Sequence, residues 1–538
     1  MRKKFSLILI GFFALGLLLP ALASAGGADP SGAATGSAVD VPAAKAGSPT
    51  LGELATQVGH NKISINFVWT LVAGFLVMFM QAGFAMVESG LTRAKNAAHT
   101  MAMNFMIYPL GMLGFYLCGF AFMFGGFGPV GVLGGVDVLS NEFSITLMGK
   151  SFGLFGTKGF CLSGDAYDAA IFALFLFQMV FMDTTATIPT GSMAERWKYS
   201  AFFVYGLCVG TIIYPIYGNW VWGGGWLAML GKNFGLGHGH VDFAGSSVVH
   251  LTGGVLAFVG AKILGPRIGK FNKDGSPNAI PGHNLPMAIV GTFILAFGWF
   301  GFNAGSTLAG TDLRIAVCAT NTMLASMAGA IVATLWMWAV RTKKPDPSMM
   351  CNGMLAGLVA ITAPCAFVNS MSACIIGIVS GVLVVEAVYF IEGALKIDDP
   401  VGAVAVHGVN GAWGIIAVGL FSDGTYGDGW NGVAGPVRGL FYGDGGQLAA
   451  GLIGIAANLI YVGVVGYVVF KLIDVTIGNR VSPTDEIEGL DIPEMGVPGY
   501  VGVKLDKFSE TPLSTRKAAP GPKSDYVYRE PVSVGGGR

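Results

Sequence analysis

The chain has 538 residues, of which 53% are hydrophobic and only 12% are charged, whereas charged residues make up about a quarter of an average soluble domain. Its 31 basic and 31 acidic residues give a formal net charge of zero, so the composition indicates no nucleic-acid partner. Gly occupies 83 positions without a Gly-X-Y period, which excludes a collagen helix and is typical of closely packed membrane helices.

The first 25 residues have the pattern of a secretory signal peptide. Three basic residues, Arg2 to Lys4, precede an apolar run over 5–22, and Ala23-Ser24-Ala25 matches a signal-peptidase site. We predict that residues 1–25 are cleaved; the alternative is that they form a first membrane helix. The Gly-, Ala- and Ser-rich stretch that follows, 26–62, is predicted to be a flexible, exported N-terminus.

Apolar segments long enough to cross a bilayer, which takes about 20 residues, fill most of the remaining chain. We predict eleven spans, at 65–88, 99–124, 168–192, 199–221, 243–264, 286–306, 312–340, 349–366, 371–391, 400–421 and 446–473. After a cleaved signal peptide, an odd number of spans places the mature N-terminus outside the inner (plasma) membrane and the C-terminus in the cytoplasm. Loops predicted to be inside carry twelve Lys and Arg residues and those predicted outside carry five, which agrees with the positive-inside rule.

The predicted protein is therefore an all-α integral membrane protein embedded in a lipid bilayer. Its membrane domain covers 63–475, and a cytoplasmic tail covers 476–538. The tail is expected to be largely disordered after residue 500, where the sequence is polar and contains Pro and Gly.

Five residues near the start of the fifth span recur near the start of the tenth. Asp, Gly, Val, His and Gly stand at offsets 0, 3, 7, 8 and 12; they are Asp242, Gly245, Val249, His250 and Gly254, and then Asp399, Gly402, Val406, His407 and Gly411. A weaker match pairs Gly83-Phe84 in the first span with Gly298-Trp299 in the sixth. Because five spans separate the partners, and an odd number inverts the topology, we predict two inverted five-helix repeats followed by a final helix.

The repeated histidines are expected to meet inside the membrane. His250 and His407 lie eight residues after the aspartates that open helices entering from opposite faces, which places each about 12 Å into a core about 30 Å thick. Two ionisable residues at the bilayer centre are costly unless they pair or line a pathway, so we interpret them as functional rather than as packing residues. No third ligand stands nearby, so no metal site is predicted.

Several other polar residues have competing interpretations. Asp242 and Asp399 stand where helix N-caps belong, and Asp242, at the outer mouth, would also favour an entering cation. Asp183 falls in the middle of the third span; we expect it to face the protein interior near the pore wall, protonated or paired with hydroxyls or backbone amides. His238 and His240 fall in an outer loop and are expected to be solvated.

Several motifs in fixed order resemble those of the ammonium transporter family, the ammonia channel relatives of the Rhesus glycoproteins, over residues 63–495. They are Gly90-Leu-Thr-Arg-Ala-Lys-Asn96, Phe177-Gln178 with Phe181, Gly191-Ser-Met-Ala-Glu-Arg196, Trp222-Gly-Gly-Gly225, Asp242-Phe-Ala-Gly245, Gly298-Trp-Phe-Gly-Phe-Asn-Ala-Gly-Ser306 and Val406-His-Gly408. The resemblance implies a homotrimer with a central pore in each subunit.

The resemblance also implies roles for residues along that pore. It assigns Trp222, Phe177 and Ser306 to an outer cation site, Phe181 and Phe302 to a stacked gate, and His250 and His407 to a pair of facing histidines. Aromatic faces attract a cation, an apolar path beyond them penalises a bare charge, and an imidazole pair can bind ammonia and relay a proton. The expected function is to bind ammonium and to conduct ammonia, with or without a separately relayed proton.

Two other functions remain open, and a third is not expected. The chain could be an ammonium sensor or receptor that retains the transporter fold, or a Rhesus-type ammonia gas channel. A membrane-embedded enzyme is not expected, because no nucleophile–base set, cofactor motif or metal cluster is evident, and no cofactor is predicted. The tail resembles the family's regulatory segment at Glu488-Gly489-Leu490-Asp491, which makes a PII-type signal protein a candidate partner, although Met495-Gly496-Val497 departs from the His-Gly-Glu of many members.

Overall fold

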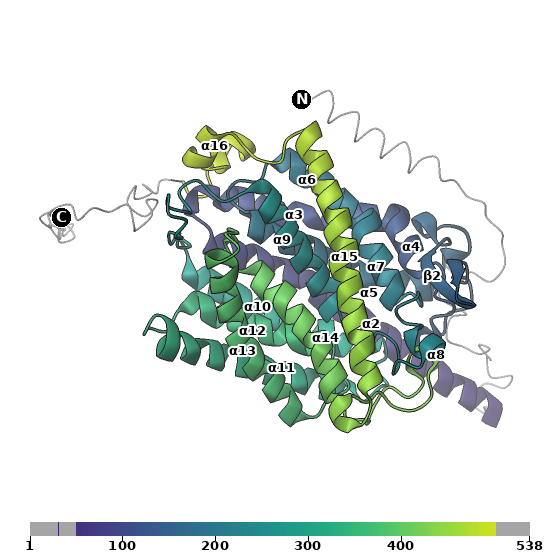
Figure 1. Ribbon diagram of the computed structural model, residues 1–538. Helices are drawn as coiled ribbons and strands as arrows, with labels where there is room; N and C mark the ends of the chain where they lie inside the picture. The colour runs from purple at the N-terminus through teal and green to yellow at the C-terminus, as the bar shows by residue number, and fades with distance from the viewer. Residues whose placement is uncertain (1–30, 32–49, 502–538) are drawn as a thin grey trace, which may run out of the picture.

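The computed structural model describes residue 31 and residues 50–501, and this part of the chain is a bundle of packed helices (Figure 1). Ten helical segments within it are long and apolar enough to cross a membrane, which confirms the all-α membrane architecture. Their helices are α2 (Leu51–Leu91), α3 (Ala97–Gly114) with α4 (Phe120–Phe124), α5 (Ala169–Met193), α6 (Tyr199–Cys208) with α7 (Tyr214–Val221), α9 (Thr252–Leu264), α10 (Leu285–Asn303), α11 (Ile315–Trp336), α13 (Ser370–Gly393), α14 (Asn410–Phe421) and α15 (Gly445–Thr476). The predicted signal peptide and the tail beyond residue 501 lie outside the described residues.

The eighth predicted span is shorter than expected. Its helix, α12 (Pro347–Thr362), has 16 residues, fewer than the about 20 that cross a hydrocarbon core. It ends before Pro364, which has no amide hydrogen with which to continue the helix. Asn321 donates from its side-chain amide to the carbonyls of Cys365 and Val368, at 3.0 and 2.7 Å. The residues after Thr362, which were predicted to be helical up to residue 366, therefore form a turn that the Asn321 side chain stabilises.

Helix α2 begins at Leu51, before residue 63, where the membrane domain was predicted to start. Thr50 and Glu53 form a capping box, in which each side chain accepts a hydrogen bond from the other residue's backbone amide. This Thr-x-x-Glu pattern marks a helix N-terminus, and α2 runs from Leu51 for 41 residues. Residues 51–62, predicted as part of a flexible segment, are therefore helical.

A β-hairpin was not predicted. Strands β1 (Glu142–Leu147) and β2 (Lys150–Gly156) pair antiparallel, and both loop residues, Met148 and Gly149, have positive φ, 52° and 70°, as in a type I′ turn. The indole nitrogen of Trp220 and the backbone amide of Trp226 donate to carbonyls of β2, each at 3.0 Å. The hairpin thereby fixes the loop after α7.

The two halves of the bundle repeat the same unusual feature in their fifth and tenth spans. Each begins with a π-helical turn, η7 (Ser246–Leu251) before α9 and η10 (Val404–Val409) before α14, and each turn contains one of the histidines. Just before each turn lies a glycine with positive φ, Gly245 at 122° and Gly402 at 79°, which suits residues without a side chain. The repeat seen in the sequence therefore corresponds to matched backbone geometry.

Close packing brings these two spans against each other in opposite directions. A Cβ atom on Gly254 would lie 2.2 Å from the backbone nitrogen of Gly408, and one on Gly411 would lie 2.5 Å from the carbonyl oxygen of Ser246. The start of one helix therefore contacts the later part of the other. This antiparallel crossing is what an inverted repeat requires.

The segment after α15 folds back onto one end of the bundle. It contains the short helix α16 (Pro483–Glu488) and the turn η13 (Asp491–Met495), seen at the upper left of Figure 1. Carboxylates of this segment accept backbone amide hydrogens from three separate parts of the bundle: Glu486 from Ile268, Asp491 from His99 and Glu494 from Tyr199, at 2.7, 2.9 and 2.8 Å. We call this end the tail end, and the end that carries β1 and β2 the hairpin end.

Candidate functional site

The two repeated aspartates hold the turns that carry the histidines. Asp242 accepts hydrogen bonds from the backbone amides of Gly245, Ser246, Ser247 and Val248 and from the Ser247 hydroxyl, at 2.7–2.9 Å. Asp399 accepts from the amides of Gly402 and Val404, at 3.0 and 2.8 Å. Both carboxylates thus act as helix caps, one of the two predicted roles, and no cation contact is needed to explain them.

The two histidines lie face to face between the halves of the bundle. The Nδ1 atoms of His250 and His407 are 3.1 Å apart, and their ring centroids are 5.2 Å apart at 24°. A hydrogen bond between two Nδ1 atoms needs one donor and one acceptor, so a neutral pair shares one proton at this contact. Each ring packs on an aromatic residue at a matched position of the repeat: His250 on Trp299 at 5.2 Å and His407 on Phe84 at 6.0 Å.

A stack of aromatic rings separates the histidines from the hairpin end. Phe181 of α5 and Phe302 of α10 have ring centroids 4.1 Å apart at 26°, and Phe302 lies 5.4 Å from His250. Trp222 meets Phe181 edge to face at 6.0 Å. The two residues assigned to a gate are therefore in direct contact, and no gap for a solute lies between their rings in this conformation.

A cavity with a volume of about 190 Å³ lies on the hairpin side of this stack. Its walls include all three residues assigned to the outer cation site, Phe177, Trp222 and Ser306. The Ser306 hydroxyl donates to the carbonyl of Phe302 at 2.7 Å, which leaves its oxygen as an acceptor. Trp222 donates from its indole nitrogen to the carbonyl of Asp242 at 2.7 Å, so the cap of η7 also orients the ring.

Two further residues of this cavity were missed as site residues. Gln178 lines it, and its side-chain oxygen has no hydrogen-bond partner among the described residues. Because Gln178 lies one turn before Phe181 and Met182 on α5, it could have been predicted from the helix face that carries Phe181. His240 also lines the cavity, and its Nε2 lies 2.8 Å from the Ser247 hydroxyl oxygen. Burial lowers the pKa of His240, which favours the neutral ring.

The expectation that His238 and His240 are solvated was wrong. Both side chains are buried, because Gln447 of α15 holds their loop. Its side-chain oxygen accepts from the backbone amide of His238 at 3.0 Å, and its side-chain nitrogen donates to the carbonyl of Gly239 at 2.9 Å. A contact between segments more than 200 residues apart leaves no local signal in the sequence.

Asp183 lies inside the protein, as predicted. Its side chain is buried in α5, two residues after Phe181, but its Oδ1 atom has no hydrogen-bond partner among the described residues. The hydroxyl or amide expected at this oxygen is therefore absent.

A second, small cavity lies on the tail side of the histidines. It is lined by His407 and Phe84 together with one acidic residue, Glu88 of α2, and one amide, Asn352 of α12. In residues 50–501 and at residue 31, no group of three or more His, Cys, Asp and Glu side chains is arranged to hold a metal ion.

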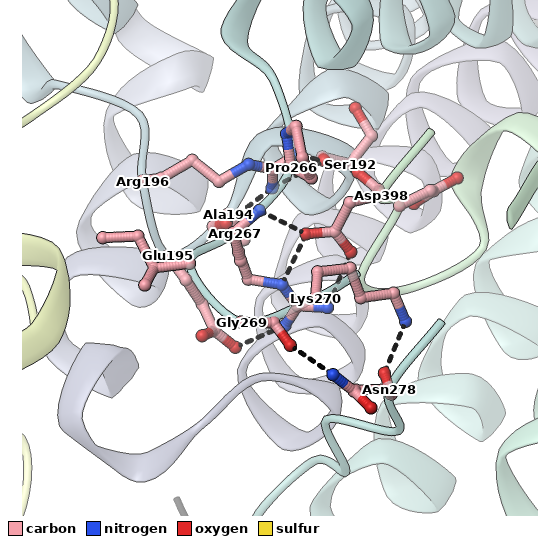
Figure 2. A network of polar contacts seen from close by, with 12 residues as sticks. Ser192, Ala194, Glu195, Arg196, Pro266, Arg267, Gly269, Lys270, Asn278 and Asp398 are labelled. Carbon is pink, nitrogen blue, oxygen red and sulfur yellow. Dashed lines mark hydrogen bonds and ion pairs between the residues drawn. The ribbon is translucent and has the colours of Figure 1, made fainter. Parts of the chain in front are cut away.

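A buried ionic network fixes the loops at the tail end (Figure 2). Glu195 pairs with Arg93 at 2.5 Å and with Arg267 at 2.9 Å, and Arg267 also makes a two-pronged contact with Asp398, at 2.8 and 2.9 Å. Burial alone would raise the pKa of the Asp398 carboxyl, but the Arg267 guanidinium holds that pKa well below its usual range. The network joins the loops that follow α2, α5, α9 and α13, and so holds the segment that leads into η10.

In the described part of the chain, a bundle of ten helical segments that are each long and apolar enough to cross a bilayer defines an integral membrane protein. The model of the Ammonium Transporter Family matches residues 68–500. The chain belongs to the ammonium transporter family, and it is a multi-pass membrane protein of ammonium transport.

Named relatives and solved structures agree with this placement. Ammonium transporter Amt2 of Archaeoglobus fulgidus is 45% identical over 460 residues, which cover 85% of this chain and 92% of the relative. Ammonium transporter Amt1 of Haloferax mediterranei is 35% identical over 484 residues, 86% of this chain and 85% of the relative. Among solved structures, one described as a sensor Amt protein has a TM-score of 0.69 at 35% identity, and the match covers 81% of this chain and 99% of that structure. Mep2 of Candida albicans has a TM-score of 0.64 at 26% identity, and the match covers 78% of this chain and 87% of that structure.

Proposed function

We propose that the protein binds ammonium in the cavity at the hairpin end and passes ammonia through the gate to the histidine pair, which relays the proton separately. The observation that carries this proposal is the 3.1 Å contact between the Nδ1 atoms of His250 and His407, directly behind the Phe181–Phe302 stack. An imidazole pair that shares one proton at a buried contact can pass a proton between its two ends.

The cavity at the hairpin end suits a small cation that donates hydrogen bonds. The ring of Trp222 offers a cation–π face, while the Ser306 hydroxyl oxygen and the unpartnered side-chain oxygen of Gln178 offer acceptors. Potassium has a similar charge and size but donates no hydrogen bond. The acceptors therefore favour ammonium over potassium.

Beyond this cavity the passage favours the neutral species. Bringing a bare charge between Phe181 and Phe302 would cost several kcal/mol, because their rings provide no polar atom to replace its hydration. Ammonium therefore passes the rings more easily after it has given up a proton, as neutral ammonia. The Nε2 of His250 has no hydrogen-bond partner among the described residues, so it can bind ammonia after the rings move apart.

We further propose that the hairpin end faces outside and the tail end the cytoplasm of a plasma membrane, after removal of residues 1–25. Predicted inner loops carry twelve basic residues against five outside, which supports this orientation. Three copies are proposed to assemble into a trimer, with one pore each. A PII-type protein is proposed to bind at the tail end, where residues 482–500 are docked and accessible.

The proposal is tested by measuring current and internal pH in proteoliposomes given an ammonium gradient, with a potassium gradient as the control. A saturable, ammonium-specific current is expected. Ammonia entry with a pH change but no current would favour a Rhesus-type gas channel. Binding of ammonium without any flux would instead favour a sensor, and either result would refute the proposed mechanism.

A further inference from the structure

We infer that Glu88 is the site at the tail end of the pore where ammonia and its relayed proton recombine, an inference that rests on the proposed function. The reaction is a single proton transfer. Ammonia that has passed His407 takes the proton of the Glu88 carboxyl group, which yields ammonium and a carboxylate. The carboxylate then regains a proton delivered through the histidine pair, so that one ammonium ion leaves for each cycle.

The first support is the shape of the small cavity. Glu88 and His407 line the same space, whose remaining walls include the apolar side chains of Phe84, Leu355 and Val406. It leaves about 20 Å³ for the centre of a water-sized molecule, which is enough to hold one such molecule. Ammonia is of this size. A solute that leaves His407 toward the tail end therefore meets the Glu88 region next.

The second support is the way in which Glu88 is held. The side-chain amide of Asn104 donates to its Oε2 at 2.6 Å, and the Thr190 hydroxyl oxygen lies 2.7 and 2.9 Å from its two oxygens. The same hydroxyl lies 2.5 Å from the carbonyl oxygen of Thr187. A hydroxyl has one proton, so when Thr190 donates to this carbonyl it can only accept from Glu88, which must then carry a proton. The geometry thus accommodates both the acid and the carboxylate.

The third support is the charge around Glu88. It is buried and forms no ion pair with Lys or Arg among the described residues. The titratable groups that face it are His407, across the cavity, and the Asp399 carboxylate. An ionised carboxylate in such surroundings is unfavourable unless a cation approaches. Ammonium formed at this position is such a cation.

The repeat makes the acid specific to this end of the pore. The match of Gly83-Phe84 to Gly298-Trp299 places Asn303 at the position of Glu88. Asn303 is buried and its side-chain amide donates to the Thr322 hydroxyl at 2.8 Å. An amide cannot exchange a proton as a carboxyl group does, so of these two matched residues only the one at the tail end can return a proton to ammonia.

The test compares Glu88→Gln and Glu88→Asp with wild type, and uses Glu386→Gln as the matched control. Glu386 is also a membrane-helix glutamate, but it pairs with Arg341 away from the pore. In proteoliposomes, Glu88→Gln should lower the maximal ammonium current at least about tenfold and leave the half-saturating ammonium concentration unchanged. Glu88→Asp, which keeps a carboxyl group, should recover part of the current, and Glu386→Gln should behave as wild type.

If Glu88→Gln carries the same current as wild type, the inference about Glu88 is overturned but the proposed function stands. If wild type itself carries no ammonium current, both the inference and the proposed function are refuted. A merely structural role would reduce the amount of assembled protein but not the current per assembled molecule. If Glu88→Gln does not assemble, infrared difference spectra of wild type and Glu88→Asp decide. Ammonium should change a carboxylic-acid band whose frequency differs between the two proteins, and the absence of such a band would overturn the inference.

Discussion

Replacement of Trp222 by leucine should weaken ammonium binding without closing the pore. Trp222 lines the cavity at the hairpin end and lies above the gate, 6.0 Å from Phe181. A cation–π contact contributes about 0.5–2 kcal/mol, so its loss should raise the half-saturating ammonium concentration by about two- to thirtyfold. The maximal current should stay within a few-fold of wild type, because the histidine pair is untouched.

A second substitution at the same position separates two causes. Trp222 also donates to the carbonyl of Asp242 at 2.7 Å, and Trp222→Phe removes this hydrogen bond but keeps an aromatic face. Phenylalanine should therefore retain more affinity than leucine when current is recorded over a range of ammonium concentrations. Equal losses in the two variants would mean that the hydrogen bond matters rather than the ring face. An unchanged concentration dependence in Trp222→Leu would remove this residue from the site.

Three other predictions follow from the same structure. His250→Leu or His407→Leu should abolish proton-coupled ammonium current or its discrimination against potassium. Aspartate should substitute better than leucine at one of the two positions, since it still exchanges protons. Wild-type current and selectivity in the double leucine variant would contradict the proton relay. Asp398→Asn should lower stability by up to about 3–5 kcal/mol, because it removes one of the two carboxylates that pair with buried Arg267 and leaves only Glu195, and a lower Tm in detergent would report this. Since Arg267 lowers the pKa of Asp398, this stabilisation is present above pH about 4 and is lost as the pH falls further, so acidification should destabilise wild type more than the variant. Deletion of 502–538, which has little apolar content, should leave an assembled, active protein by size-exclusion chromatography and flux, and loss of assembly would show that the segment is structural.

The sequence predicted the contact between the two histidines better than the structure around them. His250 and His407 could be paired because the repeat places them at equal depth from opposite faces, and depth along a helix follows from counting residues. Their capping aspartates could be recognised from position alone. The order of Trp222, Phe181 and Phe302 along the pore came from the family resemblance, because individual phenylalanines in a membrane helix are mostly packing residues.

What could not be predicted depends on contacts between distant segments. His240 is buried because Gln447 holds its loop, and Glu195 joins Arg93 to Arg267 across three loops. None of these pairs is close in the chain or periodic. The early start of α2 is different, since the capping box at Thr50 and Glu53 was present in the sequence, but the polar composition of the segment favoured the opposite interpretation.

The paired π-turns, η7 and η10, carry information about how the protein arose. A π-turn contains one residue more than the α-helical turn it replaces, and here the extra residue occurs at the same place in both halves, beside His250 and His407. If the two halves had been joined before either gained its extra residue, two independent insertions at matched positions would be needed. One insertion suffices if it preceded the duplication. Duplication of a half that already held its histidine on a widened turn would produce this arrangement, in which two facing copies convert a single buried imidazole into a pair.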